Sequence, residues 1–170
     1  GSGTSEGLAG IQLGKRWGGG AHYAGQPSDL PAMMREADAA RLIGDDALRA
    51  FWQPTHLEKY DLGTEWTRWT CLPMVYAVWA VRREFAEARP DADRDVAAAS
   101  GRSPDYCPEH RDAIAEYAAR CVPIPAMHLR SYSDQLQFPF APAFHFPLAC
   151  YLRASHDPVH PTSDPAFRSL

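Results

Sequence analysis

The sequence has no long apolar run and no concentrated positive charge. Its longest apolar segment without a charge, residues 72–81, has ten residues, whereas a helix needs about 20 apolar residues to cross a bilayer. The 17 lysines and arginines are outnumbered by 21 aspartates and glutamates, and the net charge is −4. A nucleic-acid-binding surface needs basic residues gathered on one face. We therefore expect neither a membrane nor a nucleic acid as a partner.

Cysteines are few, and no two of them have a metal-binding spacing. The four are Cys71, Cys107, Cys121 and Cys150. They form no C-x-x-C pair, and the start of the printed sequence lacks the charged and apolar regions of a signal peptide. Scattered cysteines in a chain of this size are typical of reduced thiols and not of a disulfide framework. We therefore expect a cytoplasmic protein.

Motifs for nucleotides, metals and nucleophilic catalysis are missing as well. The glycine-dense stretch 14–25 contains Gly14-Lys15 but not the G-x-x-x-x-G-K-[ST] frame of a phosphate loop. His156 and His160 lie four apart, as zinc ligands on a helix do, but a proline lies between them. We interpret both features as incidental, and we find no Ser-His-Asp or Cys-His arrangement. No metal and no cofactor is expected.

The sequence does contain a dominant central stretch, residues 60–81, with three of the five tryptophans. A chain of this length can form one ordinary domain with a real core, and this stretch must be covered by it. The run at 72–81 is rich in β-branched and aromatic residues, which favours a strand covered on both faces, although a buried helix is the alternative. Trp66 and Trp69 lie three apart, so one helical turn would place them on one face. Core packing is the usual role of such a pair.

A segment before the central stretch has the pattern of a strand, a glycine turn and a helix. Residues 40–43 are a short strand candidate, Gly44 begins the turn, and Asp45 and Asp46 precede a helix at 47–51. Open α/β sheets place their ligands at such junctions, where a strand turns into a helix. One of the two aspartates could equally be a helix cap without a functional role. From the residues alone both interpretations stay open.

Further helices are predicted from caps and hydrophobic periodicity. Thr4-Ser5 precedes Leu8 and Ile11 as the start of a short helix. Residues 100–104 are expected to be a break in the chain. The other predicted helices are Pro31–Ala37, residues 82–89, Pro90–Ala99, Pro108–Arg120 and a weak one at Leu148–Arg153. The tail from Ala154 is rich in proline and serine, and we expect it to be disordered.

The central stretch carries a specific order of residues, and this order resembles a known family. The residues are Asp61-Leu62-Gly63, Trp66, Trp69-Thr70, Leu72-Pro73 and Val75. The stretch is similar to D-L-G, a tryptophan and then W-T-G-L-P-F-V in the chorismate dehydratases of the futalosine route to menaquinone. Thr4-Ser5 resembles the family's helix start, and Leu42-Ile43-Gly44-Asp45 resembles its L-I-G-D turn. The resemblance extends over about residues 4–150.

The resemblance implies an α/β fold of the periplasmic-binding-protein-like type (type II), in which two lobes hold the substrate between them. Residues 1–71 would be an α/β segment of the second lobe, and residues 72–153 would be the return strand and helices of the first lobe. Residues 154–170 would be the disordered tail. Family members extend further at the N-terminus, where much of the first lobe is formed. The stretch Thr70–Pro73 would lie on the hinge side of the ligand cleft.

The activity implied by the resemblance is that of a lyase, which dehydrates chorismate to 3-[(1-carboxyvinyl)oxy]benzoate in menaquinone biosynthesis. Thr4 and Ser5 would anchor a substrate carboxylate at a helix start. Gly44 and Asp45 would bind the substrate from the turn, and Thr70 from the hinge. The resemblance implies no cofactor, and the catalytic acid and base are not identified. The alternatives are a non-catalytic solute-binding module for a small carboxylate and an inactive fragment, and an oligomer is possible.

Several residues depart from the family pattern. Glu6 falls where the family is apolar, Arg41 lies in the predicted core strand, and Cys71 replaces a glycine. If the family structure is kept, we expect each departure to destabilise the fold by about one to a few kcal/mol. Prolines also replace helix formers near the end of the match, at Pro139, Pro142 and Pro147.

Overall fold

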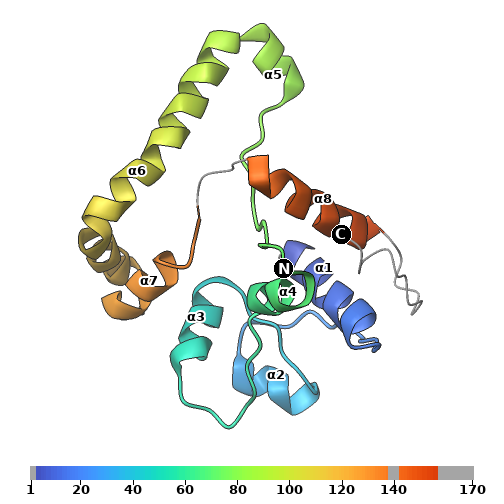
Figure 1. The fold of residues 1–170 in the computed structure, drawn as a ribbon. Coiled ribbons are helices and arrows are strands. Elements are labelled where there is room, and N and C mark those ends of the chain that lie inside the picture. Colours follow the sequence, from blue (N-terminus) through green and yellow to red (C-terminus); the bar gives the residue numbers. More distant parts are fainter. Residues whose placement is uncertain (1–2, 138–141, 157–170) are drawn as a thin grey trace. The chain divides into compact units, whose positions relative to one another are not determined.

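The computed structural model describes residues 3–137 and 142–156, without the side chains of 103–106, and every regular element in these residues is helical (Figure 1). The chain divides into two compact units. The first contains the chain up to Tyr76 and again from Pro142, and the second runs from Ala77 to Ala141. None of the helices in the described part combines the length and the apolar character needed to span a bilayer.

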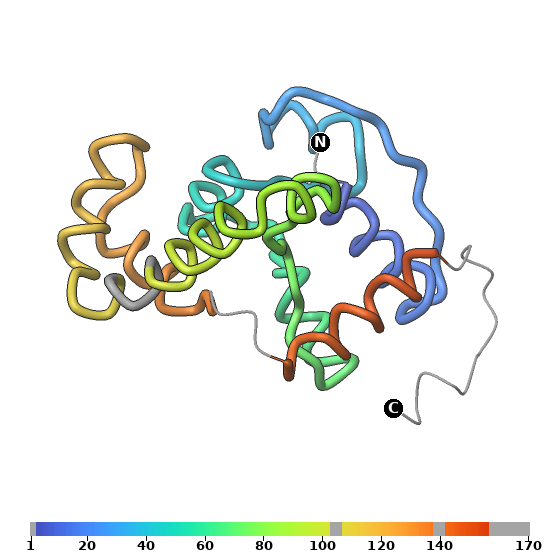
Figure 2. Tube along the Cα trace, turned by 90° about the horizontal axis from the view of Figure 1, so that it is seen from above, coloured from blue at the N-terminus to red at the C-terminus, as the bar shows by residue number. Residues whose placement is uncertain are grey.

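The first unit is built from helices at both ends of its sequence. These are α1 (Gly3–Ile11), the π-helix η1 (Gln12–Arg16), α2 (Leu30–Glu36), α3 (Gly44–Trp52), α4 (Leu62–Thr70), the 3₁₀ helix η2 (Pro142–Phe144) and α8 (His145–His156). Helix α1 contacts both α4 and α8, two elements that are far apart in the chain (Figure 2).

Two aspartates fix the starts of α2 and α4. Asp29 Oδ1 accepts a hydrogen bond from the N–H of Ala32 at 3.0 Å, and Asp61 Oδ1 accepts one from the N–H of Thr64 at 2.7 Å. Each carboxylate satisfies an N–H group that has no partner within its helix, which stabilises the helix by about 1 kcal/mol. The predicted helix start before Pro31 is confirmed.

The core of the first unit surrounds the indole of Trp66, which is fully buried. The rings of Trp66 and Trp69 meet edge to face at 5.9 Å between centroids, and the ring of Tyr151 meets Trp66 in the same way at 6.1 Å. Such contacts add to the burial of apolar surface. The prediction that Trp66 and Trp69 share a helical turn and pack in the core is confirmed. The remaining core residues are Leu8, Ile11 and Ala154, with Leu62 and Met74 packed at the edge.

The second unit is a helical arrangement of α5 (Arg83–Ala88), α6 (Pro90–Cys121) and α7 (Ala126–Ser133). Helix α6 packs on α7 and on α5. The buried residues of this unit are Ala115, Ile124 and Leu129. Ion pairs between α6 and the end of α7 join Arg111 to Asp134 and Arg130 to Asp112. These pairs are exposed, so they stabilise the unit by at most about 1 kcal/mol each.

Helix α6 continues through the segment predicted to interrupt it. Residues 100–104 are helical, and the only non-helical backbone angles within α6 are at His110 (φ −122°, ψ 19°). Pro108 has no N–H to donate, and its ring crowds the preceding turn, so it kinks the helix. The packing of α6 on α5 and α7 supports the helix on both sides of the kink. The predicted break was therefore wrong, because proline bends this helix without ending it. The helices predicted from Pro90 and from Pro108 are one kinked element.

The two predicted strands do not occur in the described residues. Residues 40–43 and 73–82 belong to no helix and no strand, so the predicted α/β class is not observed there. The expectation that the apolar run 72–81 is covered was also wrong for its second half: Tyr76 is 53 %, Val78 48 %, Trp79 90 % and Val81 51 % exposed. A strand also requires a neighbour that pairs with its backbone, and composition does not reveal such a neighbour.

The last helix is longer than predicted, in spite of its proline. Helix α8 covers residues 145–156 and not only 148–153. Pro147 is buried in its first turn, where a helix does not need the missing N–H. Pro142 begins η2. Pro139, His160 and the tail from residue 157 lie outside the described residues.

Cys71 ends α4 with a positive φ angle. Its backbone angles are φ 59° and ψ 17°, and its N–H donates to the carbonyl of Thr67 at 2.9 Å. It is the only described residue other than glycine with a positive φ. The left-handed region at a helix end is favourable for glycine and strained for residues with a Cβ atom. The departure from the family glycine therefore has a local conformational cost.

We expect Cys71→Gly to stabilise the protein. Removing the Cβ atom relieves about 1 kcal/mol of strain in the left-handed region, so the free energy of unfolding in urea should rise by about that amount. Cys71→Ala is the matched control, because it removes the thiol but keeps the Cβ atom, and it should not stabilise. Equal gains in the two variants, or a loss in Cys71→Gly, would contradict the assignment.

Candidate functional site

Thr4 and Ser5 lie in the first turn of α1, as their resemblance to a helix start predicted. Helix α1 is described from Gly3 onward, so both residues are inside the helix and not in front of it. Both are half-buried. The carbonyl of Thr4 accepts a hydrogen bond from the phenol of Tyr151 at 3.1 Å. The first turn of α1 is therefore held by α8.

Thr70 is the last residue of α4, and its hydroxyl forms hydrogen bonds with the backbone. Its Oγ1 donates to the carbonyl of Trp66 at 2.8 Å and accepts from the N–H of Leu72 at 3.2 Å. A hydroxyl has one hydrogen to donate. In this conformation the Thr70 hydroxyl secures the end of α4 and has no second hydrogen to offer a carboxylate.

Gly44 and Asp45 begin α3, and neither aspartate of this turn caps the helix. Gly44 has φ 61°, and the N-cap position is Ile43, which makes no side-chain capping bond. Asp45 is exposed, whereas Asp46 forms an ion pair with Arg49 one turn later. The interpretation of these acids as caps was therefore wrong. Both carboxylates lie near the positive end of the helix dipole, but neither forms the capping hydrogen bond.

The structure brings together some of the predicted site residues and not others. Helices α1 and α4 are in contact, and Trp66 and Tyr151 connect the region of Thr4 with that of Thr70. Glu6 of α1 also forms an ion pair with Arg41, in the segment before α3, at 3.7 Å. Thr4, Ser5 and Thr70 thus belong to one packed group, and no contact described here joins Gly44 or Asp45 to it.

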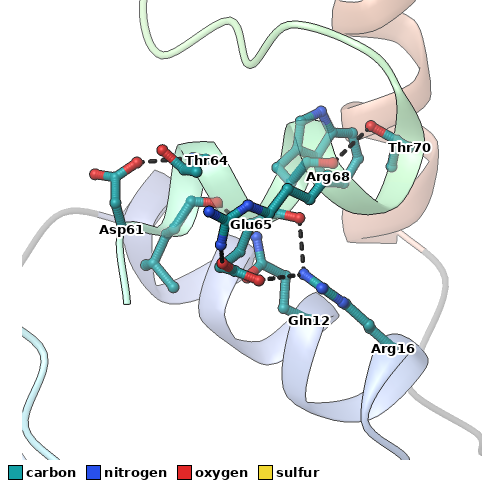
Figure 3. Close-up of polar contacts among 9 residues, drawn as sticks. Gln12, Arg16, Asp61, Thr64, Glu65, Arg68 and Thr70 are labelled. Carbon is teal, nitrogen blue, oxygen red and sulfur yellow. Dashed lines mark hydrogen bonds and ion pairs between the residues drawn. The ribbon is translucent and has the colours of Figure 1, made fainter. Parts of the chain in front are cut away.

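The sequence analysis missed a network of polar residues between η1 and α4 (Figure 3). Arg16 Nη1 donates to Glu65 Oε2 at 2.7 Å and to the Glu65 carbonyl at 2.8 Å. Arg68 Nη1 donates to Glu65 Oε1 at 2.6 Å. Gln12 Nε2 donates to the carbonyl of Leu62 at 2.7 Å. The spacings of Gln12 with Arg16 and of Glu65 with Arg68 place each pair on one helical face, but no spacing reveals that the two faces meet.

The carboxylate of Glu65 is mostly buried and stays charged because two guanidinium groups face it. Its side chain is 8 % exposed, compared with 23 % for Arg16 and 67 % for Arg68. Burial raises the pKa of the Glu65 carboxyl, but the hydrogen bonds and charges of Arg68 and Arg16 outweigh burial, and the pKa lies below its ordinary value of 4.5. One carboxylate between two cations leaves this cluster with a net positive charge.

No group of three or more histidine, cysteine or acidic side chains in the described part of the chain is arranged to hold a metal ion. The four cysteines are free thiols, and Cys150 is buried in the first unit.

The chain belongs to a family of menaquinone biosynthesis proteins, whose model matches residues 1–152. The match includes every predicted site residue and most of α8. Among individual relatives, the chorismate dehydratase of Thermus thermophilus is 30% identical over an alignment of 175 residues. This alignment covers 85% of the present chain and 63% of the relative. The chain therefore spans less than two thirds of that relative's length.

The interactions of Glu65 with Arg16 and Arg68 make the fold less stable at acid pH. The pKa of Glu65 is lower in the folded chain than in the unfolded chain. The ionised carboxylate therefore contributes fully to the free energy of unfolding when the pH is above its ordinary pKa. This contribution is lost as the pH falls through the lowered pKa of the folded chain. Urea unfolding measured from neutral to acid pH should show a shallower loss of stability for Glu65→Gln than for the wild type.

Glu58→Gln is the matched control for this titration, because Glu58 is an exposed glutamate of the same unit. It should follow the wild-type dependence on pH. Parallel curves for Glu65→Gln and the wild type would show that the two arginines do not lower the pKa of Glu65.

Proposed function

We propose that this protein dehydrates chorismate to 3-[(1-carboxyvinyl)oxy]benzoate in menaquinone biosynthesis. The observation that carries the proposal is the similarity to a chorismate dehydratase over 85% of the chain, within a menaquinone biosynthesis family matched at residues 1–152. The dehydratase motif around Asp61, Gly63 and Trp66 has a structural role that fits such a relationship, since it forms the start and the buried face of α4.

The two-lobed periplasmic-binding-protein-like architecture is part of this proposal. Residues 1–71 would belong to the second lobe, and residues 72–153 would return into the first. The predicted disordered tail does not begin at Ala154, because this residue is buried in α8. The division of the chain near Tyr76 into two compact units supports a lobed design. We place the reaction in the cytoplasm, where free thiols persist.

The first turn of α1 is suited to hold a carboxylate of the substrate. Chorismate carries two carboxylates, while the chain has a net charge of −4 and does not attract anions as a whole. Attraction must therefore come from local donors. Thr4 and Ser5 offer hydroxyls beside the N–H groups and the positive dipole end of a helix. We assign these two residues to carboxylate binding.

Gly44 and Asp45 would bind the substrate from the start of α3. The Asp45 carboxylate is exposed and caps no helix, so it can accept a hydrogen bond from a substrate hydroxyl. The hydroxyl of Thr70 keeps the C-terminal turn of α4 in place. We therefore assign Thr70 to shaping the site from the hinge side.

The reaction itself needs a base for one ring proton and assistance for one departing hydroxyl. A C–H bond and a C–O bond break, the proton and the hydroxide leave as water, and the ring becomes aromatic. No electrons leave the substrate, so no oxidant is required. The residues that move the proton are not assigned.

We expect the purified protein to convert chorismate to 3-[(1-carboxyvinyl)oxy]benzoate, and Ser5→Ala to lower kcat/KM by about 10- to 100-fold. The factor corresponds to one hydrogen bond to a charged group, worth about 1.5–3 kcal/mol. Product formation can be followed by the absorbance of the benzoate and identified by mass spectrometry.

Ser155→Ala is the matched control, since Ser155 is an exposed serine on α8 whose hydroxyl donates to a backbone carbonyl of its own helix. It should retain wild-type kcat/KM. Folded wild-type protein without turnover would contradict the proposal. If chorismate then raised the melting temperature without being consumed, the protein would be a binding module for a small carboxylate.

A further inference from the structure

We propose that Tyr151, on α8, is a positioning residue for the carboxylate-binding turn of α1, an inference that rests on the proposed function. The phenol Oη lies 3.1 Å from the carbonyl oxygen of Thr4, although the two residues are 147 positions apart. This is the direct polar contact by which the end of the described chain reaches the predicted anchor residues.

The phenol of Tyr151 is held from two sides. Tyr151 is 8 % exposed, and its ring meets the indole of Trp66 edge to face. A Cβ atom added to Gly7 would lie 3.1 Å from the phenol oxygen. Gly7 therefore leaves the space through which the phenol reaches the backbone of α1.

The phenol acts on Ser5 through the peptide plane. The carbonyl of Thr4 and the N–H of Ser5 belong to one planar group, so a hydrogen bond that fixes the carbonyl also fixes the direction of that N–H. In the first turn of a helix this direction decides how well an anion is bound. Burial raises the pKa of Tyr151 above its ordinary value of 10.0, so the phenol remains protonated and keeps donating at neutral and mildly alkaline pH.

Tyr151→Phe tests this role, because it removes one oxygen and keeps the ring packed on Trp66. We expect KM for chorismate to rise about tenfold, with kcat within about twofold of the wild type, since substrate anchoring and not the chemical step is affected. Partial unfolding would instead lower the active fraction, and so kcat, at constant KM. Tyr60→Phe is the control, because Tyr60 is 65 % exposed in the same unit, and it should leave KM unchanged.

Gly7→Ala provides a second test with a different variant. The new methyl group crowds the phenol oxygen, so KM should rise in the wild-type background. In the Tyr151→Phe background that oxygen is absent, and Gly7→Ala should add less than about twofold. Independent, multiplicative effects of the two changes, or an unchanged KM in Tyr151→Phe, would overturn the proposal.

The amide resonance of Ser5 separates this inference from the proposed function. In Tyr151→Phe, the ¹⁵N and ¹H shifts of the Ser5 amide should change, because the carbonyl of the same peptide loses its donor, while those of Gly44 should stay. This measurement needs no turnover. If the wild type were inactive towards chorismate, the proposed function would fall, and the Ser5 resonance would still decide whether Tyr151 positions this turn: an unchanged resonance would overturn it.

Discussion

The buried indole of Trp66 is the contact on which the first unit depends. An indole buries about 150–250 Å² and its loss typically destabilises a domain by about 3–5 kcal/mol, a large part of the usual 5–15 kcal/mol. Helices α1 and α8 both contribute side chains to its surroundings. Because Thr70 is bonded to the Trp66 carbonyl and Tyr151 packs on the indole ring, the positions of Thr70 and Tyr151 follow from the position of Trp66.

The residue before Trp66 provides a second, ionic attachment of α4. Glu65 is bound by Arg16 from η1, so α4 is joined to the N-terminal segment by an apolar contact and by a charged one. The two attachments differ in their response to conditions, since burial of apolar surface weakens on cooling and the ion pairs weaken on protonation of the carboxylate. The same core also contains the indole N–H of Trp66 and Oε1 of Gln12, buried without a hydrogen-bond partner in the described structure.

Local signals in the sequence predicted local structure well. The helix start before Pro31 and the shared turn of the tryptophan pair of α4 were predicted correctly, because caps and helical spacing are decided within a few residues. The strand at 72–81 and the contact between Glu65 and Arg16 concern partners far along the chain, and no spacing encodes them. Of the predicted substrate-binding residues, Gly44 and Asp45 lie in a turn that the residue pattern had already marked, whereas Thr4, Ser5 and Thr70 were assigned to substrate binding by family resemblance.

The ion pair of Glu6 with Arg41 joins two residues that each depart from the family pattern. Considered alone, either charge near the core would be unfavourable, but each is the other's counter-ion, and both keep partial contact with solvent. The two departures therefore compensate each other in this chain. Restoring an apolar residue at only one of these positions would leave the other charge alone, so the two sites should vary together among close relatives, and a chimaera that exchanges α1 without the segment before α3 would separate them.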